Sequence, residues 1–266
     1  MDRRQRENAA AAALRECRQA FAAGGTSAIA EVTGRDVAAV DGLHYPPGEV
    51  YDPATHAQYF YHRHAGGSGG QRGPEAREHG HFHLFLRGDG VPAGITPLLL
   101  PDAAVANAPM PSQSAPLKRG RRDEVCHLVA IALDARGEPI RLFTTNRWVT
   151  GESWYGADDV IGLLERFRLR SNAPLPLVNR WLAALLQLFA TDIAVLLHER
   201  DRVIQKRRWR WRTNVLEDPR LEIASSLDIS LDTRLAAIEE DSNAPAVAAG
   251  ANGARRLPRM AEGWGA

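Results

Sequence analysis

Two stretches of the chain alternate aromatic and polar residues with the period expected of β-strands. Residues 59–64 read Tyr-Phe-Tyr-His-Arg-His, and residues 78–85 read Glu-His-Gly-His-Phe-His-Leu-Phe. Successive side chains on a strand point to opposite faces of the sheet, so alternate residues share a face. The residues between them, 65–78, are rich in Gly and favour a loose hairpin loop. The pattern therefore predicts two antiparallel strands, each with histidines on one face.

Further elements follow from hydrophobic spacing and from turn residues. Residues 126–133 and 140–145 predict a second hairpin, because an Arg-Gly turn separates two β-rich runs. The segment that starts at His44 contains two prolines and is expected to be extended. Helices are expected over residues 7–23, 27–32, 158–168 and 177–205, the last with a break near 191–192, and one more within 213–240.

This order of elements predicts an α+β fold, in which a small antiparallel sheet carries a His-rich face and is packed by N- and C-terminal helices. We expect one domain over residues 1–240. Residues 87–120 are rich in Pro, Ala and Gly and indicate a long loop or insertion. Residues 241–266 offer little apolar surface to bury and indicate a disordered tail.

The histidines are the main candidates for chemistry. Pairing His64 with His79 also pairs His62 with His81 and Phe60 with His83. Residues two apart on a strand are separated by about 6.7 Å, and cross-strand Cβ atoms by about 5 Å, so several imidazoles can reach one ion. Neutral imidazole suits zinc or iron. We therefore expect a divalent transition metal whose ligands come from five residues: His62, His64, His79, His81 and His83.

Other titratable residues allow more than one interpretation. Glu78 is expected on the opposite face from His79, either as a solvent-exposed charge or as a general base near a metal-bound water. His44 and His56 precede the first His strand and could fold back over the cluster. His127 shares the phase of Val129 and Ile131 along its strand, so it is either a core residue or a contributor to the cluster.

Residues 146–155 form a loop with a cation and flat rings. Arg147, Trp148, Trp154 and Tyr155 could line one wall of a substrate site, although a Trp-rich loop can equally close one end of a core. The basic stretch 206–212 contains Trp209 and Trp211, and we favour a cationic helix end with both indoles in the core over a nucleic-acid surface.

Composition restricts the class of protein. The formal net charge of +1 gives no global attraction to nucleic acid or to an anionic membrane. The two cysteines, Cys17 and Cys126, lack a CxxC partner, which is compatible with a reducing cytosol. Charges interrupt the N-terminal apolar run early, so it indicates an amphipathic helix rather than a signal peptide. Residues 181–197 are bracketed by charges and indicate a core helix rather than a membrane span.

The run from His79 to Phe85 resembles the motif of the histidine-triad nucleotide hydrolases and transferases. That resemblance implies that His81 attacks a phosphate as a nucleophile without a metal, supported by His79 and His83. Gly80 departs from the apolar residue of that motif. Residues 8–240 as a whole also resemble an uncharacterised bacterial family of unknown function, which implies no activity.

The sequence thus favours a metal-dependent hydrolase with a small-molecule substrate and with His81 and Glu78 as catalytic groups. Two alternatives remain open. One is a protein that binds or senses metal without turnover, for which an exposed cluster without a pocket is expected. The other is metal-free phosphate-ester hydrolysis or nucleotidyl transfer through His81. The oligomeric state is not predicted.

Overall fold

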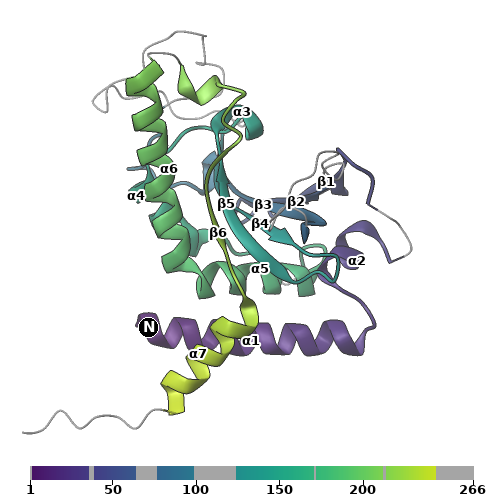
Figure 1. Ribbon diagram of the computed structural model, residues 1–266. Helices are drawn as coiled ribbons and strands as arrows, with labels where there is room; N and C mark the ends of the chain where they lie inside the picture. Colours follow the sequence, from purple (N-terminus) through teal and green to yellow (C-terminus); the bar gives the residue numbers. More distant parts are fainter. Residues whose placement is uncertain are drawn as a thin grey trace, which may run out of the picture.

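The fold was analysed in a computed structural model, which describes residues 2–35, 39–63, 77–98, 124–170, 172–211 and 214–243. Its centre is a six-stranded antiparallel sheet in which each strand pairs with the next one along the chain (Figure 1). The strands are β1 (His44–Tyr51), β2 (Ala57–His62), β3 (Gly80–Arg87), β4 (Val125–Leu133), β5 (Pro139–Thr145) and β6 (Ile223–Asp228). Together with the helices around it, this sheet confirms the predicted α+β class.

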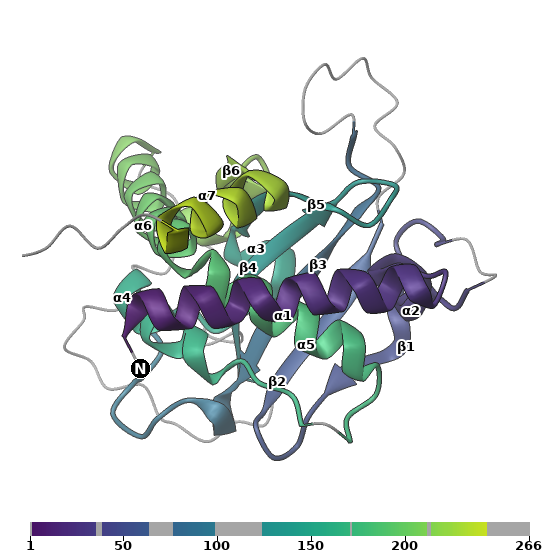
Figure 2. The same ribbon diagram turned by 90° about the horizontal axis from the view of Figure 1, so that it is seen from below.

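Helices cover one face of the sheet. Figures 1 and 2 show α5 between the sheet and α1, while α6 stands along the edge formed by β5 and β6. The helices are α1 (Arg3–Ala23), α2 (Ala28–Thr33), α3 (Arg147–Thr150), α4 (Ala157–Leu163), α5 (Pro176–Leu188), α6 (Ala190–Trp211) and α7 (Leu231–Asn243). Short 3-10 turns occupy Gly88–Gly90, Leu164–Arg166 and Val215–Glu217.

The main core lies between this face of the sheet and the helices. Tyr59 and Phe82 on the central strands are fully buried there, and the Phe82 ring meets Trp181 of α5 edge to face. The Tyr59 hydroxyl donates a 2.7 Å hydrogen bond to Asn179 of the same helix. Since alternate residues point away from this core, the phase of the strands directs the histidines towards the opposite face.

Several boundaries differ from the predicted ones. β6 lies inside the segment 213–240, for which only a helix was expected, and it pairs with β5 at the edge of the sheet. The long C-terminal helical region breaks at Phe189, where α5 and α6 meet at 71°. Among the described residues no single helix is long and apolar enough to cross a membrane. The bent pair α5–α6 meets the length and composition of a membrane span only when its two helices are taken as one segment.

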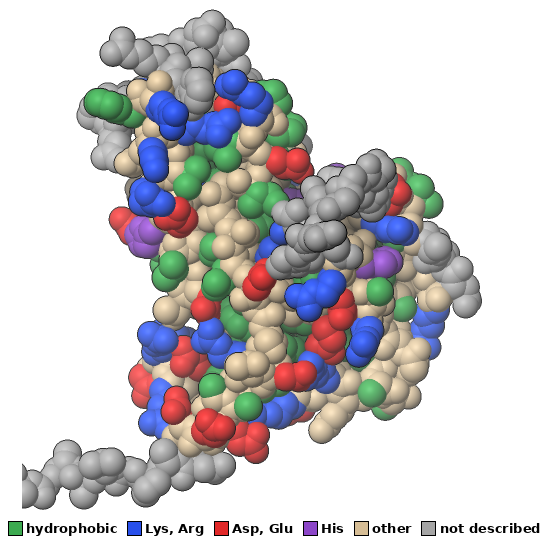
Figure 3. Space-filling view, in the orientation of Figure 1, with side chains coloured by type: hydrophobic (Ala, Val, Ile, Leu, Met, Phe, Trp, Pro, Cys, Tyr) green, Lys and Arg blue, Asp and Glu red, His purple; other side chains and the backbone are tan. Residues whose placement is uncertain are grey.

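The remaining segment predictions are tested only in part. Residues 99–123, most of the expected insertion, lie outside the described residues, as do residues 244–266 of the expected tail. α7 continues to Asn243, past the start expected for that tail. The prediction that Trp209 is in the core was wrong, because its side chain is 87% exposed at the end of α6. Figure 3 shows basic side chains gathered along the same helix. The side chain of Trp211 lies outside the description.

Gly80 begins β3 at a point of very close approach. A Cβ at this position would lie 2.6 Å from the His62 carbonyl oxygen and 2.5 Å from the Tyr61 hydroxyl. Carbon atoms do not approach oxygen so closely, so any side chain here must displace the neighbouring strand. Close packing against β2, rather than backbone flexibility, therefore requires glycine at this position.

We expect Gly80→Ala to lower the free energy of unfolding by about 1–3 kcal/mol, the usual cost of overpacking. Gly162→Ala in α4 is the matched control, because nothing lies within 4 Å of its Cβ position, and it should leave stability unchanged or raise it by about 0.5–1 kcal/mol. Denaturant unfolding of the two variants measures the difference. Equal stability of the two variants would contradict the close-approach argument.

Candidate functional site

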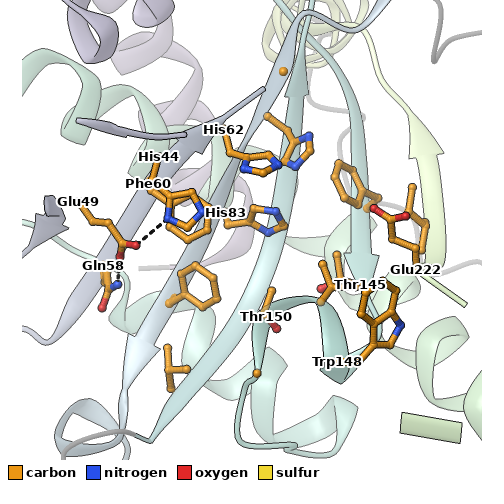
Figure 4. A pocket seen from close by; sticks show the side chains of 18 of the residues that line it. His44, Glu49, Gln58, Phe60, His62, His83, Thr145, Trp148, Thr150 and Glu222 are labelled. Carbon is orange, nitrogen blue, oxygen red and sulfur yellow. Dashed lines mark hydrogen bonds and ion pairs between the residues drawn. The ribbon is translucent and has the colours of Figure 1, made fainter. Parts of the chain in front are cut away.

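The face of the sheet opposite α1 and α5 lines a pocket of about 1010 Å³. Its floor consists of side chains from β2, β3 and β5, and its rim includes residues of β1 and α3 and the segment before β6. Figure 4 shows His62 and His83 on neighbouring strands directed to the same side, with Trp148 and Glu222 across the cavity. Pockets of this size accommodate small organic molecules.

The register predicted for the two His strands is the one that forms. His62 pairs with His81, and Phe60 pairs with His83. The ring centroids lie 5.3 Å apart for His62 and His81 and 4.7 Å apart for His81 and His83. Three of the five predicted imidazoles therefore gather on one face. His64 lies outside the described residues.

Glu78 and His79 exchange the faces that were expected for them. The regular strand begins only at Gly80, so the alternation does not extend back to these two residues. The His79 ring borders the pocket but stacks on Tyr61, whose hydroxyl bonds its Nδ1 at 2.7 Å. Glu78 instead faces His81, and its Oε1 lies 2.7 Å from His81 Nδ1. The carboxylate is thus in the cluster, and His79 is held apart from it.

Glu78 and His81 form a partly desolvated pair with a third member. Arg141 of β5 donates to the second carboxylate oxygen of Glu78. Burial by itself would raise the pKa of Glu78, but the hydrogen bonds and charges of His81 and Arg141 outweigh it and hold that pKa below its ordinary value. The ionised carboxylate accepts from Nδ1–H of His81. In the neutral ring, the acceptor nitrogen is then Nε2, on the opposite edge.

His44 occupies the rim of the pocket on β1. Its ring stacks on Phe60 with centroids 3.7 Å apart and planes 9° from parallel, and its Nδ1 bonds Glu49 at 3.0 Å. The ring centroid is 5.5 Å from that of His62. Of the histidines that could fold back over the cluster, His44 does so. His56 bonds the Tyr51 hydroxyl outside the pocket lining.

A β-bulge brings His127 to the pocket face. The register between β3 and β4 shifts between Leu84 and Phe85, so that Val129 pairs with Leu84 while His127 pairs with Phe85. The extra residue reverses the phase of β4, and His127 leaves the face of Val129. Its Nε2 lies 3.0 Å from His83 Nδ1, and its Nδ1 lies 3.2 Å from Thr145 Oγ1. His127 therefore stands directly behind His83.

The buried Glu152 supports the bulge. Its Oε2 accepts a 3.0 Å hydrogen bond from the backbone N–H of His127, while the N–H of Ser153 bonds the Val125 carbonyl. Burial raises the pKa of Glu152 to about 7, against the opposing charge of Arg200 and the hydrogen bond from His127. Burial lowers the pKa of a histidine, the opposite of its effect on a carboxyl group, because it disfavours the charged imidazolium form.

Two imidazoles are consequently neutral over the physiological range. Burial, reinforced by the neighbouring histidines, lowers the pKa of His83 well below its ordinary value. Burial together with the charge of Arg200 lowers the pKa of His127 to about 3. Neutral imidazole can donate from one nitrogen and accept at the other, which protonated rings cannot do.

One of the four loop side chains predicted to form a substrate wall lines the pocket. Trp148 lines it, and its indole N–H donates to the Leu221 carbonyl. The structure does not bring the other three there. Arg147 is buried and pairs with Glu217, Trp154 packs in a second core beneath the Arg200 guanidinium, and Tyr155 belongs to the main core.

Two pocket residues on β5 were not predicted as site residues, although their strand phase places them on the pocket face. Arg141 and Phe143 alternate with Ile140 and Leu142, and the second hairpin pairs Arg141 with Ala132. Arg141 and Phe143 share a strand face with Thr145, and all three border the same cavity. Combining the registers of the two predicted hairpins would have placed them beside His81 and His83.

No group of three or more His, Cys, Asp or Glu side chains among the described residues is arranged to hold a metal ion. The predicted ligands His62, His81 and His83 do share one face of the sheet. Their ring centroids lie between 4.7 and 6.4 Å apart. The arrangement can supply an oriented basic nitrogen, neutral hydrogen-bond donors and apolar ring surfaces around a bound small molecule.

The raised pKa of Glu152 predicts a pH-dependent loss of stability. Its folded value of about 7 exceeds its ordinary value of 4.5, so the unfolded carboxyl releases its proton first as the pH rises. The free energy of unfolding should fall across pH 4.5 to 7 by up to about 3 kcal/mol. Glu152→Gln keeps an acceptor for His127 and removes the ionisation. It should be more stable than the wild type at pH 8 and differ from it less at pH 5.

Denaturant unfolding at both pH values measures this, with Glu239→Gln at an exposed position as the baseline. A stability difference between Glu152→Gln and the wild type that does not change with pH would contradict the assignment.

Comparison with known proteins gives a family but no activity. A family described as a domain of unknown function (DUF6969) matches residues 8–229. No curated protein and no solved structure matches the chain. The resemblance to the histidine-triad hydrolases receives no support from these comparisons. The resemblance to an uncharacterised family is confirmed, since the match spans most of the sequence, and the chain belongs to the DUF6969 family of unknown function.

Proposed function

We propose that the pocket is the active site of a hydrolase that cleaves small-molecule esters, with His81 as general base. The observation that carries this proposal is the hydrogen bond between Glu78 and His81 Nδ1 at the edge of the cavity. A carboxylate that accepts from one imidazole nitrogen orients the ring and leaves the other nitrogen basic, which is a recurrent way to prepare a general base.

The reaction would proceed as a direct hydrolysis. Nε2 of His81 takes a proton from a water molecule as the water oxygen bonds to the acyl carbon. Collapse of the resulting tetrahedral species breaks the bond to the leaving oxygen, which receives the proton from the His81 imidazolium. Water is thereby added across the ester bond and no other reactant is consumed. Glu78 stabilises the transient positive charge on the ring.

Arg141 supports the same pair from its other side. Its bond to the second oxygen of Glu78 fixes the carboxylate, and its guanidinium lies 5.3 Å from the Phe143 ring centroid. Because Arg141 keeps Glu78 ionised, the carboxylate does not take the proton that His81 must return to the leaving group. The partly buried salt bridge thus orients the base without competing for its proton.

A metal-dependent hydrolase is the second candidate, and it is supported by the gathering of three imidazoles on one face, not by a preformed ligand set among the described residues. His62, His81 and His83 lie on one face, and Nδ1 of the last two is held by Glu78 and His127. Outer partners of this kind orient imidazoles that bind metal, and zinc or iron would suit the donors. The alternative of a protein that only binds or senses metal has less support, because a pocket accompanies the cluster.

We expect His81→Gln to lower kcat for neutral chromogenic esters by at least about 100-fold, since general acid–base catalysis contributes about 10²–10⁴. Glu78→Gln should lower it less, because the ring is retained but its orienting charge is lost. His56→Gln is the control, as that histidine lies outside the pocket. Steady-state kinetics on aryl and alkyl esters, with phosphate monoesters as a separate arm, measures the effect. Full activity in His81→Gln would contradict the proposal.

Metal content separates the two candidates. Protein purified without a His-tag is assayed by elemental analysis, then with and without a chelator. Hydrolysis that survives the chelator supports His81 as the base. Activity that is lost with the chelator and restored by zinc or iron, together with one ion per chain, would replace it with the metal-dependent candidate.

A further inference from the structure

A hydrogen-bond chain runs behind His83 through three adjacent strands. Thr145 Oγ1 on β5 lies 3.2 Å from His127 Nδ1 on β4, and His127 Nε2 lies 3.0 Å from His83 Nδ1 on β3. All three side chains are buried. The chain connects the pocket to the β-bulge, whose backbone N–H is held by Glu152. Thr145 and His83 also line the pocket, whereas His127 does not.

Each link of this chain contains a single hydrogen. A neutral imidazole carries a proton on one nitrogen only, and the 3.0 Å approach of His127 Nε2 to His83 Nδ1 leaves room for one hydrogen between the two rings. The chain therefore has two possible directions. In one, Thr145 donates to His127, and His127 donates to His83, which leaves the His83 proton on Nε2. In the other, every link is reversed and the His83 proton is on Nδ1.

The first direction is the favourable one. It places the proton of both imidazoles on Nε2, which is the preferred tautomer of a free neutral imidazole side chain. It also begins at a hydroxyl, which can rotate to donate. The reverse direction requires the less favourable tautomer in both rings. Partner atoms decide the tautomer of a buried histidine, so the chain should fix that of His83.

We propose that His83 is a neutral hydrogen-bond donor, through Nε2–H, to the carbonyl oxygen of a bound ester, and that His127 and Thr145 are positioning residues that fix its tautomer. The inference rests on the proposed function and deepens it, because it assigns a carbonyl substrate and the group that polarises it. A neutral donor aimed at an oxygen that becomes negative stabilises the transition state more than the substrate.

The assignment also gives different roles to His81 and His83, which lie next to each other on one face of β3. Their ring centroids lie 4.7 Å apart at nearly perpendicular planes, on the same strand face. Glu78 sets the proton of His81 on Nδ1, so Nε2 accepts. His127 sets the proton of His83 on Nε2, so Nε2 donates. A base for water and a donor for the carbonyl oxygen thus stand side by side.

The tautomers can be read directly in the full chain at neutral pH. Long-range ¹H–¹⁵N correlation spectra of ¹⁵N-histidine-labelled protein distinguish protonated from unprotonated ring nitrogens. We expect His83 and His127 to carry the proton on Nε2 and His81 to carry it on Nδ1. Thr145→Val removes the hydrogen bond to Nδ1 of His127 and should change the chemical shift of that nitrogen, while Thr145→Ser should restore it.

Kinetics of His127 variants supply the second readout. His127→Leu should lower kcat about 10–100-fold with little change in KM, because it disorders a donor that acts in the transition state. His127→Gln retains an N–H donor and should recover part of that loss. Thermal unfolding of both variants identifies any effect that is only structural, since such an effect would not be rescued selectively by glutamine.

The outcomes are distinct for the two proposals. A His83 proton on Nδ1, or on both nitrogens, in the resting wild type overturns this inference, and Nδ1–H alone would favour metal ligation through Nε2. The expected tautomers without any hydrolysis of the ester panel would support the positioning by His127 and overturn the proposed function. Equal kcat in wild type and His127→Leu overturns the role of His127.

Discussion

Burying imidazoles on one face of a sheet is the constraint on which the rest of the site depends. A buried ring nitrogen without a partner costs about 1–3 kcal/mol, and a buried charge costs more. The rings of this pocket meet the constraint in different ways. His81 has a carboxylate and His83 has another imidazole, whereas His44, exposed at the rim, bonds a carboxylate and stacks on a phenyl ring. Each solution fixes a proton and therefore a chemical role.

Much of the fold and the central pairing could be predicted from the sequence. The period of two along residues 59–64 and 78–85 determines which side chains share a face, and matching the histidines gives the pairing of His62 with His81. This argument works because β2 and β3 are regular over those residues. The argument does not apply before Gly80, because the regular strand begins there. The faces predicted for Glu78 and His79 are therefore the reverse of the observed ones.

What could not be predicted depends on tertiary contacts. A bulge adds one residue without a clear mark in local sequence, so the phase of β4 gave no indication that His127 turns towards His83. The choice between Trp148 at the pocket and Trp154 in a core is likewise made by distant residues, such as Arg200, whose guanidinium lies over the Trp154 ring. The edge strand β6 exists because β5 offers it an unpaired edge.

The same strand spacing that made the histidines visible also limits what they can do. His81 and His83 are two residues apart on β3, so both border one cavity, with ring centroids 4.7 Å apart. Two histidines on the same face of one strand would ordinarily have similar surroundings and similar chemistry. They differ here because the strand on which each partner lies is different: Glu78 precedes β3 itself, whereas His127 comes from β4 through the bulge. The irregularities at Gly80 and at Leu84/Phe85 therefore give the two imidazoles different partners, and on the proposed mechanism this difference makes one an acceptor and the other a donor.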